Sequence, residues 1–286
     1  MDKETLSNAL FELIRKAVVD LPSDVESALR EARDREKNER AKTIFDSIVE
    51  NVELARRDST PICQDTGVLV FYVRYGTFLN KKMIAESIVK AVQKATGENL
   101  LRPNIVHPLT RVNSNDNTGV GVPIAYFEQV DGMDYLEVTV LPKGAGSENT
   151  STLGMLDPAK GVEGVEDYIV ESIKNAGGKP CPPTVVGVGI GGSADKAMYL
   201  AKKALLRDIG SHNPDKEYSD LERRLYGRIN ELGIGPMGVG GDITCLAVHV
   251  EDADCHTASL PVAVNPQCWA ARKAEARVYK EEIMFL

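Results

Sequence analysis

Residues 61–67 read Pro-Ile-Cys-Gln-Asp-Thr-Gly and mark a change in the pattern of apolar residues. Residues 1–60 carry apolar side chains at the spacing of three amphipathic helices, whereas the residues that follow the segment have the pattern of a strand. A helix would point Cys63, Gln64 and Asp65 in three directions, and a strand would divide them between two faces. Flanked by a proline and a glycine, the segment is expected to be a loop that directs a thiol, an amide and a carboxylate to one point.

The remainder of the chain alternates between strand and helix patterns. The predicted strands are 68–75, 123–130, 135–141, 184–190, 243–250 and 260–264, and the predicted later helices are 83–97, 165–176, 194–209, 219–233 and 266–278. Asp131 and Gly132 predict a hairpin between the second and third strands. Polar loops are expected at 100–121 and 143–150. We therefore expect an α+β fold, with short strands in mixed sheets surrounded by helices, in a single domain over residues 1–286.

The composition excludes several classes of protein. The chain has 286 residues, 43% of them hydrophobic, and a net charge of −8 without a run of Lys and Arg. Nucleic acids and anionic membrane surfaces bind clustered cations, so neither partner is expected. No apolar run approaches the ~20 residues of a membrane span, and the N-terminus lacks the pattern of a signal peptide, so a cytoplasmic location is expected.

The five cysteines differ in their surroundings. Cys245 alternates with apolar residues in a predicted strand and is expected in the core. Cys63, Cys181 and Cys268 lie beside prolines in loops or at the start of a predicted helix, where a thiolate is electrostatically favoured. None forms a Cys-x-x-Cys pair, so the usual zinc spacing is absent. The alternatives are three thiols that converge on one cofactor, with Cys255 as a rival ligand, and isolated structural cysteines.

A glycine-rich segment and a histidine each allow a structural and a functional interpretation. Residues 187–192 match the dinucleotide fingerprint G-x-G-x-x-G, with Asp208 about 20 residues further on, so a nucleotide-dependent oxidoreductase is an alternative function. The next predicted helix is followed by another helix instead of a strand, which favours glycines that let a strand and a helix pack closely. His256, the histidine of a polar loop, is by itself more typical of a structural residue.

Four motifs, taken together and in order, span nearly the whole chain. They are Cys-Gln-Asp-Thr-Gly at 63–67, Lys-Gly-Ala-Gly-Ser-Glu-Asn at 143–149, Cys-Pro-Pro at 181–183 with Val-Gly-Val-Gly-Ile-Gly-Gly at 186–192, and Asn-Pro-Gln-Cys-Trp-Ala at 265–270. This set resembles the class I, iron–sulfur fumarate hydratases, whose close relatives include the α subunit of L-tartrate dehydratase. The resemblance implies the fold of the N-terminal domain of these enzymes and a hydro-lyase activity without redox chemistry.

The resemblance also implies a cofactor and the residues of an active site. A [4Fe–4S] cluster would be held by Cys63, Cys181 and Cys268, and its remaining iron would bind the hydroxyl and a carboxylate of the substrate as a Lewis acid. The further residues that the resemblance implies are Asp65 and His256 as catalytic residues, and Gln64, Arg102 and Gly146, with Arg111 as a weaker candidate, as substrate-binding residues. The planar guanidinium of an arginine suits a carboxylate.

The resemblance finally implies partners. Single-chain members continue into a second domain, whereas this sequence ends at Leu286, so we expect an α subunit that requires a separate β subunit, within a heterotetramer built on an α homodimer. The expected reaction interconverts L-malate with fumarate and water, as in the tricarboxylic acid cycle, and L-tartrate dehydration is the alternative. The motif at 143–149 is more similar to fumarases than to tartrate dehydratases.

Overall fold

A computed structural model of the protein describes residues 2–77, 79–279 and 283–286. Its contacts divide the chain into two compact units, of which unit 1 comprises residues 1–22, 51–145 and 272–286 and unit 2 comprises residues 23–50 and 146–271. Both units combine helices with a sheet, which confirms the α+β expectation. Because both units are discontinuous in sequence, the single domain over residues 1–286 stays a prediction.

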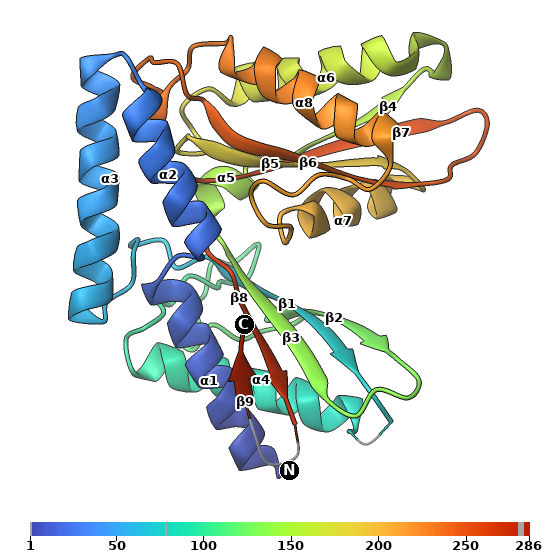
Figure 1. Cartoon of the computed structure of the whole chain (residues 1–286). Coiled ribbons are helices and arrows are strands. Elements are labelled where there is room, and N and C mark those ends of the chain that lie inside the picture. Colours follow the sequence, from blue (N-terminus) through green and yellow to red (C-terminus); the bar gives the residue numbers. More distant parts are fainter. Residues whose placement is uncertain (1, 78, 280–282) are drawn as a thin grey trace. The chain divides into compact units, whose positions relative to one another are not determined.

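Unit 1 is a five-stranded sheet in the order β2-β1-β3-β8-β9, with α1 and α4 on one face (Figure 1). Its elements are α1 (Lys3–Val19), β1 (Val68–Tyr75), α4 (Lys81–Gly97), β2 (Ile124–Gln129), β3 (Leu136–Lys143), β8 (Ala274–Val278) and β9 (Ile283–Phe285), and it also takes the C-terminal part of α3 (Glu39–Asp58). The apolar faces of α1 and α4 pack on the sheet, where Leu10, Ile88, Phe71 and Val138 are at most 1% exposed. The periodicities predicted for α1, β1, α4, β2 and β3 are confirmed.

The hairpin predicted at Asp131–Gly132 is wrong. A turn is present there, but β1 lies between β2 and β3, parallel to β2 (Val70 opposite Ile124) and antiparallel to β3 (Val70 opposite Leu141). The reason is the burial of β1, since Leu69, Val70, Phe71 and Val73 are all buried and a strand of this kind requires a neighbour on each edge. Local turn chemistry therefore joins two strands that do not pair with each other.

Unit 2 is a four-stranded sheet between two layers of helices, with α7 on one face and α6 and α8 on the other (Figure 1). The strand order is β4-β7-β5-β6. Its elements are α2 (Ser23–Arg35), the N-terminal part of α3, most of α5 (Ala145–Glu148), β4 (Thr152–Leu156), α6 (Gly161–Ala176), β5 (Thr184–Gly191), α7 (Ala194–Ala204), α8 (Lys216–Asn230), β6 (Cys245–Ala253), β7 (Leu260–Gln267) and the short 3-10 helices at Pro158–Lys160 and Pro236–Gly238. Among the described residues, no helix has both the length and the apolar character that crossing a membrane requires.

The glycines of β5 allow close packing of α7, as expected from residues 187–192. A Cβ atom at Gly187 would lie 2.0 Å from the carbonyl oxygen of Ala201, and one at Gly189 would lie 2.1 Å from that of Ala197. Val186 and Val188, on the other face of the strand, are fully buried in the core with α6 and α8. The G-x-G pattern is thus explained by strand-to-helix packing without a nucleotide.

Gly189→Ala is expected to destabilise the chain by about 3 kcal/mol or more, because the added methyl group would overlap backbone atoms of α7. The matched control is Gly227→Ala within α8, where nothing lies within 4 Å of an added Cβ and the change should stabilise by about 0.5–1 kcal/mol. Urea unfolding followed by circular dichroism measures both variants. A wild-type midpoint for Gly189→Ala would show that α7 does not pack on β5 as described.

The helix predicted over 266–278 is wrong. Residues up to Gln267 continue β7, and Ala274–Val278 form β8, which pairs antiparallel to β3 with Leu136 opposite Val278. Alanines favour a helix in isolation, but the alternate burial of Ala274, Ala276 and Val278 fits the sheet of unit 1. Cys268 is therefore in a connection between strands, and the helix-dipole argument for its thiolate no longer applies.

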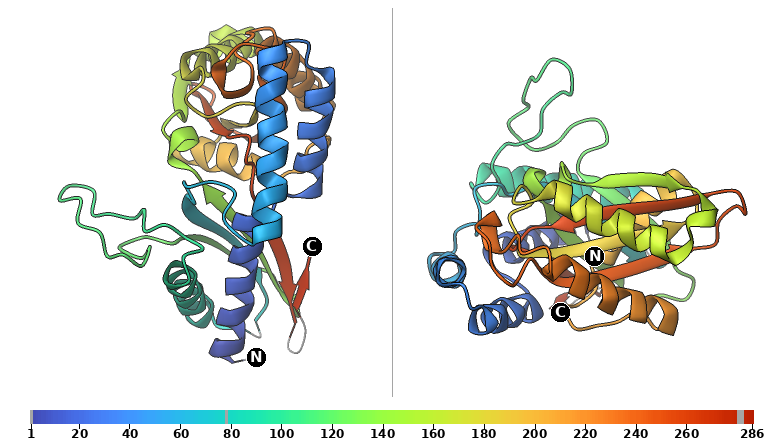
Figure 2. Two further views of the ribbon diagram at one scale, coloured as in Figure 1. Left: turned by 90° about the vertical axis from the view of Figure 1, so that its left-hand side faces the viewer. Right: turned by 90° about the horizontal axis from the view of Figure 1, so that it is seen from above.

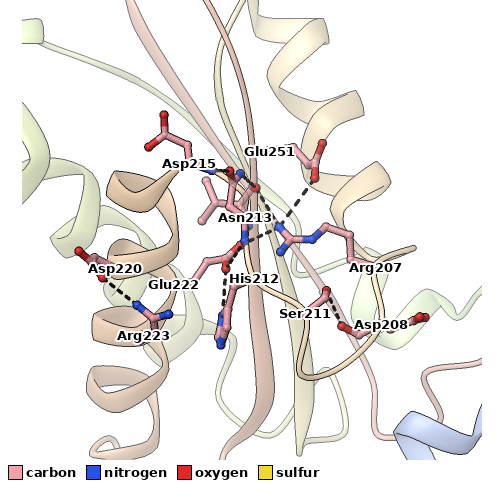
Figure 3. A network of polar contacts seen from close by, with 11 residues as sticks. Arg207, Asp208, Ser211, His212, Asn213, Asp215, Asp220, Glu222, Arg223 and Glu251 are labelled. Atoms are coloured by element: carbon pink, nitrogen blue, oxygen red, sulfur yellow. Dashed lines mark hydrogen bonds and ion pairs between the residues drawn. The ribbon is translucent and has the colours of Figure 1, made fainter.

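A buried carboxylate fixes the loop between α7 and α8 in unit 2 (Figure 3). Glu222 is 1% exposed, and its Oε1 accepts from Nη1 of Arg207 at 2.7 Å and from the backbone N–H of Val250 at 2.9 Å. Its Oε2 accepts from the backbone N–H of Asn213 at 3.0 Å and lies 3.4 Å from Nδ1 of His212. These bonds satisfy a charge that burial would otherwise penalise, and they attach the loop to β6.

Candidate functional site

The segment at 61–67 is a loop in unit 1, as predicted, and backbone contacts hold its start. The N–H of Ile62 donates to the carbonyl of Val18 at 2.9 Å, and the carbonyl of Ile62 accepts from Nδ2 of Asn51 at 2.9 Å. Ile62 itself is buried, while Cys63 is half-buried and Gln64 is exposed. The loop thus presents its thiol and amide from an anchored backbone.

Asp65 is held by two backbone donors. Its Oδ1 accepts from the N–H of Gly67 at 3.0 Å, and its Oδ2 accepts from the N–H of Ala145 at 2.7 Å. Gly67 has φ of +79° and approaches Lys143 so closely that a Cβ would lie 2.7 Å from the Lys143 carbonyl carbon. Gly144 lies beside Asp65 as well, since its Cβ would be 3.2 Å from Oδ2. The motif that starts at Lys143 therefore packs on the motif that starts at Cys63.

Arg102 is joined to the same loop through Thr66. Oγ1 of the buried Thr66 accepts from the backbone N–H of Arg102 at 3.1 Å, and Oδ1 of the buried Asn117 accepts from the next loop residues, including Asn104 at 2.8 Å. The guanidinium of Arg102 is exposed and has no hydrogen-bond partner among the described residues. The backbone of Arg102 is thus bonded to the Cys63 loop while its guanidinium has no partner. This suits the predicted role of Arg102, which is to bind a carboxylate of the substrate.

The loop that follows Arg102 extends away from the sheet and helices of unit 1 (Figure 2). Its conformation is set by Asp116, which accepts from Oγ of Ser114 at 2.6 Å and from the N–H of Thr118 at 3.0 Å. The hydrogen bond from Ser114 lowers the pKa of Asp116 to about 2. Arg111, the weaker candidate for the substrate, is exposed in this loop and has φ of +60°.

Unit 2 brings Cys181 and Cys268 together. The backbone N–H of Trp269 donates to the carbonyl of Cys181 at 3.0 Å, so the two cysteine-bearing segments are adjacent. Cys181 has φ of +55°, a strained value for a residue with a side chain, and its N–H donates to the carbonyl of Gly178 at 3.1 Å. The neighbouring Pro182 accepts from the N–H of Met237 at 2.7 Å. A rigid turn thus fixes the direction of the Cys181 thiol.

Gly146 lies in the same region of unit 2 as these cysteines. It belongs to α5, and its Cβ would be 3.3 Å from the carbonyl oxygen of Lys179, two residues before Cys181. The end of this short helix is tied to Asn265, whose Nδ2 donates to Glu148 at 3.2 Å. Gly146 is exposed, so its backbone is accessible to a ligand.

The remaining cysteines differ from these three. Cys245 is fully buried in the core, as predicted, and burial raises the pKa of its thiol. Cys255 is exposed, whereas Cys63, Cys181 and Cys268 are half-buried, and none of the five cysteines is in a disulfide bond. Among the residues that the structure describes, no three His, Cys, Asp or Glu side chains are arranged as a metal site. Ligation of a cluster by three cysteines therefore stays a prediction.

His256 lies at the opposite end of unit 2 from Cys181 and Cys268. Cys181 precedes β5 and Cys268 follows the antiparallel β7, whereas His256 precedes β7, and strands of 8 residues span roughly 25 Å. There it lines a cavity of about 700 Å³ with Cys255 and Tyr218, and its Nδ1 accepts from the N–H of Ala258 at 3.1 Å. The structure thus does not bring His256 to these two cysteines within one unit.

Two residues that support the site are not evident from the sequence. Thr66 joins Arg102 to the loop. Its role depends on its burial, at 1% exposure, and the fold alone determines that burial. Arg272, also 1% exposed, donates from Nη2 to the carbonyl of Asp65 at 2.9 Å. Its position four residues after Cys268 is the one sequence signal that could have drawn attention to it.

Comparisons with known proteins match this sequence to a family. The family model described as "Fumarate hydratase (Fumerase)" matches residues 7–277. A proposed L(+)-tartrate dehydratase subunit alpha of Methanocaldococcus jannaschii is 50% identical over 277 residues, which cover 96% of this chain and 97% of that protein. The L(+)-tartrate dehydratase subunits alpha of Escherichia coli strain UTI89 and of Shigella sonnei are 36% and 35% identical over 285 residues, covering 98% of this chain and 94% of each protein.

These matches extend over the four motifs. Fumarate hydratases and tartrate dehydratases add or remove water at a carbon–carbon bond, and the fold and loops described above fit such a hydro-lyase. The chain belongs to the fumarate hydratase family. The family resemblance stated from the four motifs is confirmed.

Proposed function

We propose that this chain is the α subunit of a [4Fe–4S]-dependent hydro-lyase that interconverts L-malate with fumarate and water. The observation that carries the proposal is the loop of Cys63, Gln64 and Asp65, which is anchored in unit 1. Thr66 joins this loop to the backbone of Arg102, whose guanidinium is exposed and unpaired among the described residues. A thiol and a carboxylate on one anchored loop, together with an unpaired cation whose backbone is bonded to that loop, suit a cluster and an anionic substrate.

The donors of the chain fit the cluster in kind. Cys63, Cys181 and Cys268 are half-buried and not in disulfide bonds, so they are accessible to iron yet shielded from bulk water. The strained backbone of Cys181 is the kind of geometry found at functional sites, and the contact of Trp269 with Cys181 supports two ligands from adjacent segments. When bound, the cluster would supply a Lewis-acidic iron that makes hydroxide an acceptable leaving group.

The residues of the chain itself would bind the substrate and transfer a proton. Arg102 would pair with one carboxylate of the dicarboxylate through its guanidinium fork. Asp65, oriented by the N–H groups of Gly67 and Ala145, would exchange a proton with the substrate while keeping a fixed direction. Gln64 would donate an amide hydrogen bond to the substrate, and Gly146 would let the backbone approach it closely.

A catalytic role for His256 would require a second copy of the chain. His256 lies at the far end of the unit 2 sheet from Cys181 and Cys268, so it would serve the cluster of a neighbouring α subunit instead of its own. This arrangement agrees with the α homodimer expected from the family resemblance. A separate β subunit would supply the rest of the substrate site. The names of the similar proteins, which are alpha subunits, support this partner.

L-tartrate dehydration is the second candidate, favoured by the names of the similar proteins. Both substrates are four-carbon 2-hydroxy dicarboxylates, so the same cluster, Arg102 and Asp65 would serve either of them. The two candidates differ in one hydroxyl group of the substrate, which a few side chains of the pocket can select.

The test is an anaerobic assay of the iron-loaded chain, alone and with its β subunit, on fumarate, L-malate and L-tartrate. We expect turnover of fumarate and L-malate by the complex, and little or none by the isolated chain. Turnover of L-tartrate alone would transfer the assignment to the second candidate. Full turnover by the isolated chain would contradict the subunit proposal, and an iron-loaded complex inactive on all three substrates would contradict the hydro-lyase assignment.

A further inference from the structure

Arg272 is a buried cation with one partner. It is 1% exposed, and it is among the largest fully buried side chains of the chain. Nη2 donates to the carbonyl oxygen of Asp65 at 2.9 Å, but Nε and Nη1 have no hydrogen-bond partner, and no carboxylate pairs with the guanidinium among the described residues. Arg207, a half-buried arginine, in contrast pairs with Glu222 at 2.7 Å.

This arrangement is costly for the chain alone. Each buried donor without a partner costs about 1–3 kcal/mol, and a buried charge without a counter-ion costs several kcal/mol in total. The single bond to the Asp65 carbonyl could be supplied by a neutral donor, so it does not explain a charged residue. Buried, unpaired N–H groups on a cation indicate an anion that binds there.

The position of Arg272 identifies the kind of anion. Its hydrogen bond reaches the residue two positions after Cys63, and the chain connects it to Cys268, four positions earlier. A dicarboxylate that diffuses in and out would need an accessible cation, as Arg102 is, whereas Arg272 is closed to solvent. An anionic group that is inserted once and then retained fits a closed site better.

We propose that Arg272 binds the iron–sulfur cluster, with Nε and Nη1 donating hydrogen bonds to its sulfur atoms; this inference rests on the proposed function. A cluster held by three thiolates carries net negative charge, and hydrogen bonds to its sulfurs together with nearby charge set its potential. The guanidinium offsets that charge, retains the cluster, and raises its reduction potential because it favours the more negative, reduced form. Arg272 also couples the cluster to Asp65, whose carbonyl it holds.

The test compares Arg272→Gln, which removes the charge, and Arg272→Lys, which keeps the charge but loses the fork, with Arg277→Gln as control. Arg277 lies on the following strand, half-exposed and paired with Glu137 at 3.1 Å. After anaerobic reconstitution, the readouts are iron and sulfide per chain, the rate of cluster loss to a chelator, and the reduction potential of the cluster. Circular dichroism of each iron-free chain monitors folding.

We expect Arg272→Gln to hold the cluster about 10- to 100-fold more weakly and to lower its potential. Arg272→Lys should lose the cluster faster than wild type but keep most of the potential, and Arg277→Gln should match wild type in both. If Arg272→Gln does not fold, Arg272→Lys decides the question through its rate of cluster loss.

Two results would overturn the inference and are distinguishable from each other. A folded Arg272→Gln chain, or in its absence the Lys variant, with wild-type cluster retention would mean that Arg272 only supports the Asp65 loop. A wild-type chain that takes up no cluster would overturn the proposed function itself, and the inference with it.

Discussion

A complex that carries Cys63→Ser is expected to lose hydro-lyase activity by about 10³-fold or more. The reason is that one of three thiolate ligands is lost, so the cluster would not be retained and its substrate-binding iron would no longer stabilise the leaving hydroxide, a contribution of several kcal/mol. Serine keeps the size of the side chain, and the loop remains anchored through Ile62, so the fold should persist. The measurements are turnover on the proposed substrates and the visible absorption of the cluster.

Cys255→Ser is the matched control, because it also removes one thiol but from an exposed loop beside His256. It should keep both activity and absorption. Activity of the Cys63→Ser complex at the wild-type level, or an equal loss in the Cys255→Ser complex, would contradict the proposed set of ligands and restore Cys255 as a candidate.

Asp65→Asn is expected to lower kcat by about 10²–10⁴-fold, the usual contribution of a proton-transfer residue. An asparagine can accept from only one of the two N–H groups that now bind the carboxylate, at Gly67 and Ala145, and its own N–H₂ would face the other donor. The variant therefore loses both the acid–base group and part of its orientation. Steady-state kinetics of the iron-loaded complex measure the change.

The control for this variant is Asp134→Asn, an exposed carboxylate of the same unit, which should leave kcat unchanged. Cluster content must be compared as well, because a loss of iron would also lower kcat. An iron-loaded Asp65→Asn complex within about twofold of the wild-type kcat would exclude Asp65 as a proton-transfer residue.

Local periodicity predicted most helices and strands, and tertiary pairing explains where it failed. The strand at Val68–Tyr75 and the helix that follows it are present because their apolar faces match the period of each element. The segment at 266–278 forms strands instead, since Ala274–Val278 completes the sheet beside β3. The partner of a strand is a long-range property, so neither this pairing nor the separation of β2 from β3 is visible in a local pattern.

The candidate site was predictable in its residue types but not in its supports. Cys63, Asp65 and Cys181 were predictable because each is a reactive residue type in an irregular segment flanked by proline or glycine. Arg272 has no such signal, because its role depends on burial and on a contact with Asp65 across more than 200 residues of sequence. His256 was predicted by family resemblance alone, and the antiparallel pairing of β5 with β7 explains why it is distant from Cys181.

The measurement that tests the central claim most directly is Mössbauer spectroscopy of the chain reconstituted with ⁵⁷Fe, in complex with the β subunit, before and after addition of L-malate. The account predicts one [4Fe–4S] cluster per chain in which a single iron lacks a thiolate ligand, and only the signal of that iron should change when the substrate binds. An absence of cluster iron, or a cluster whose spectrum is the same with and without L-malate and L-tartrate, would contradict it.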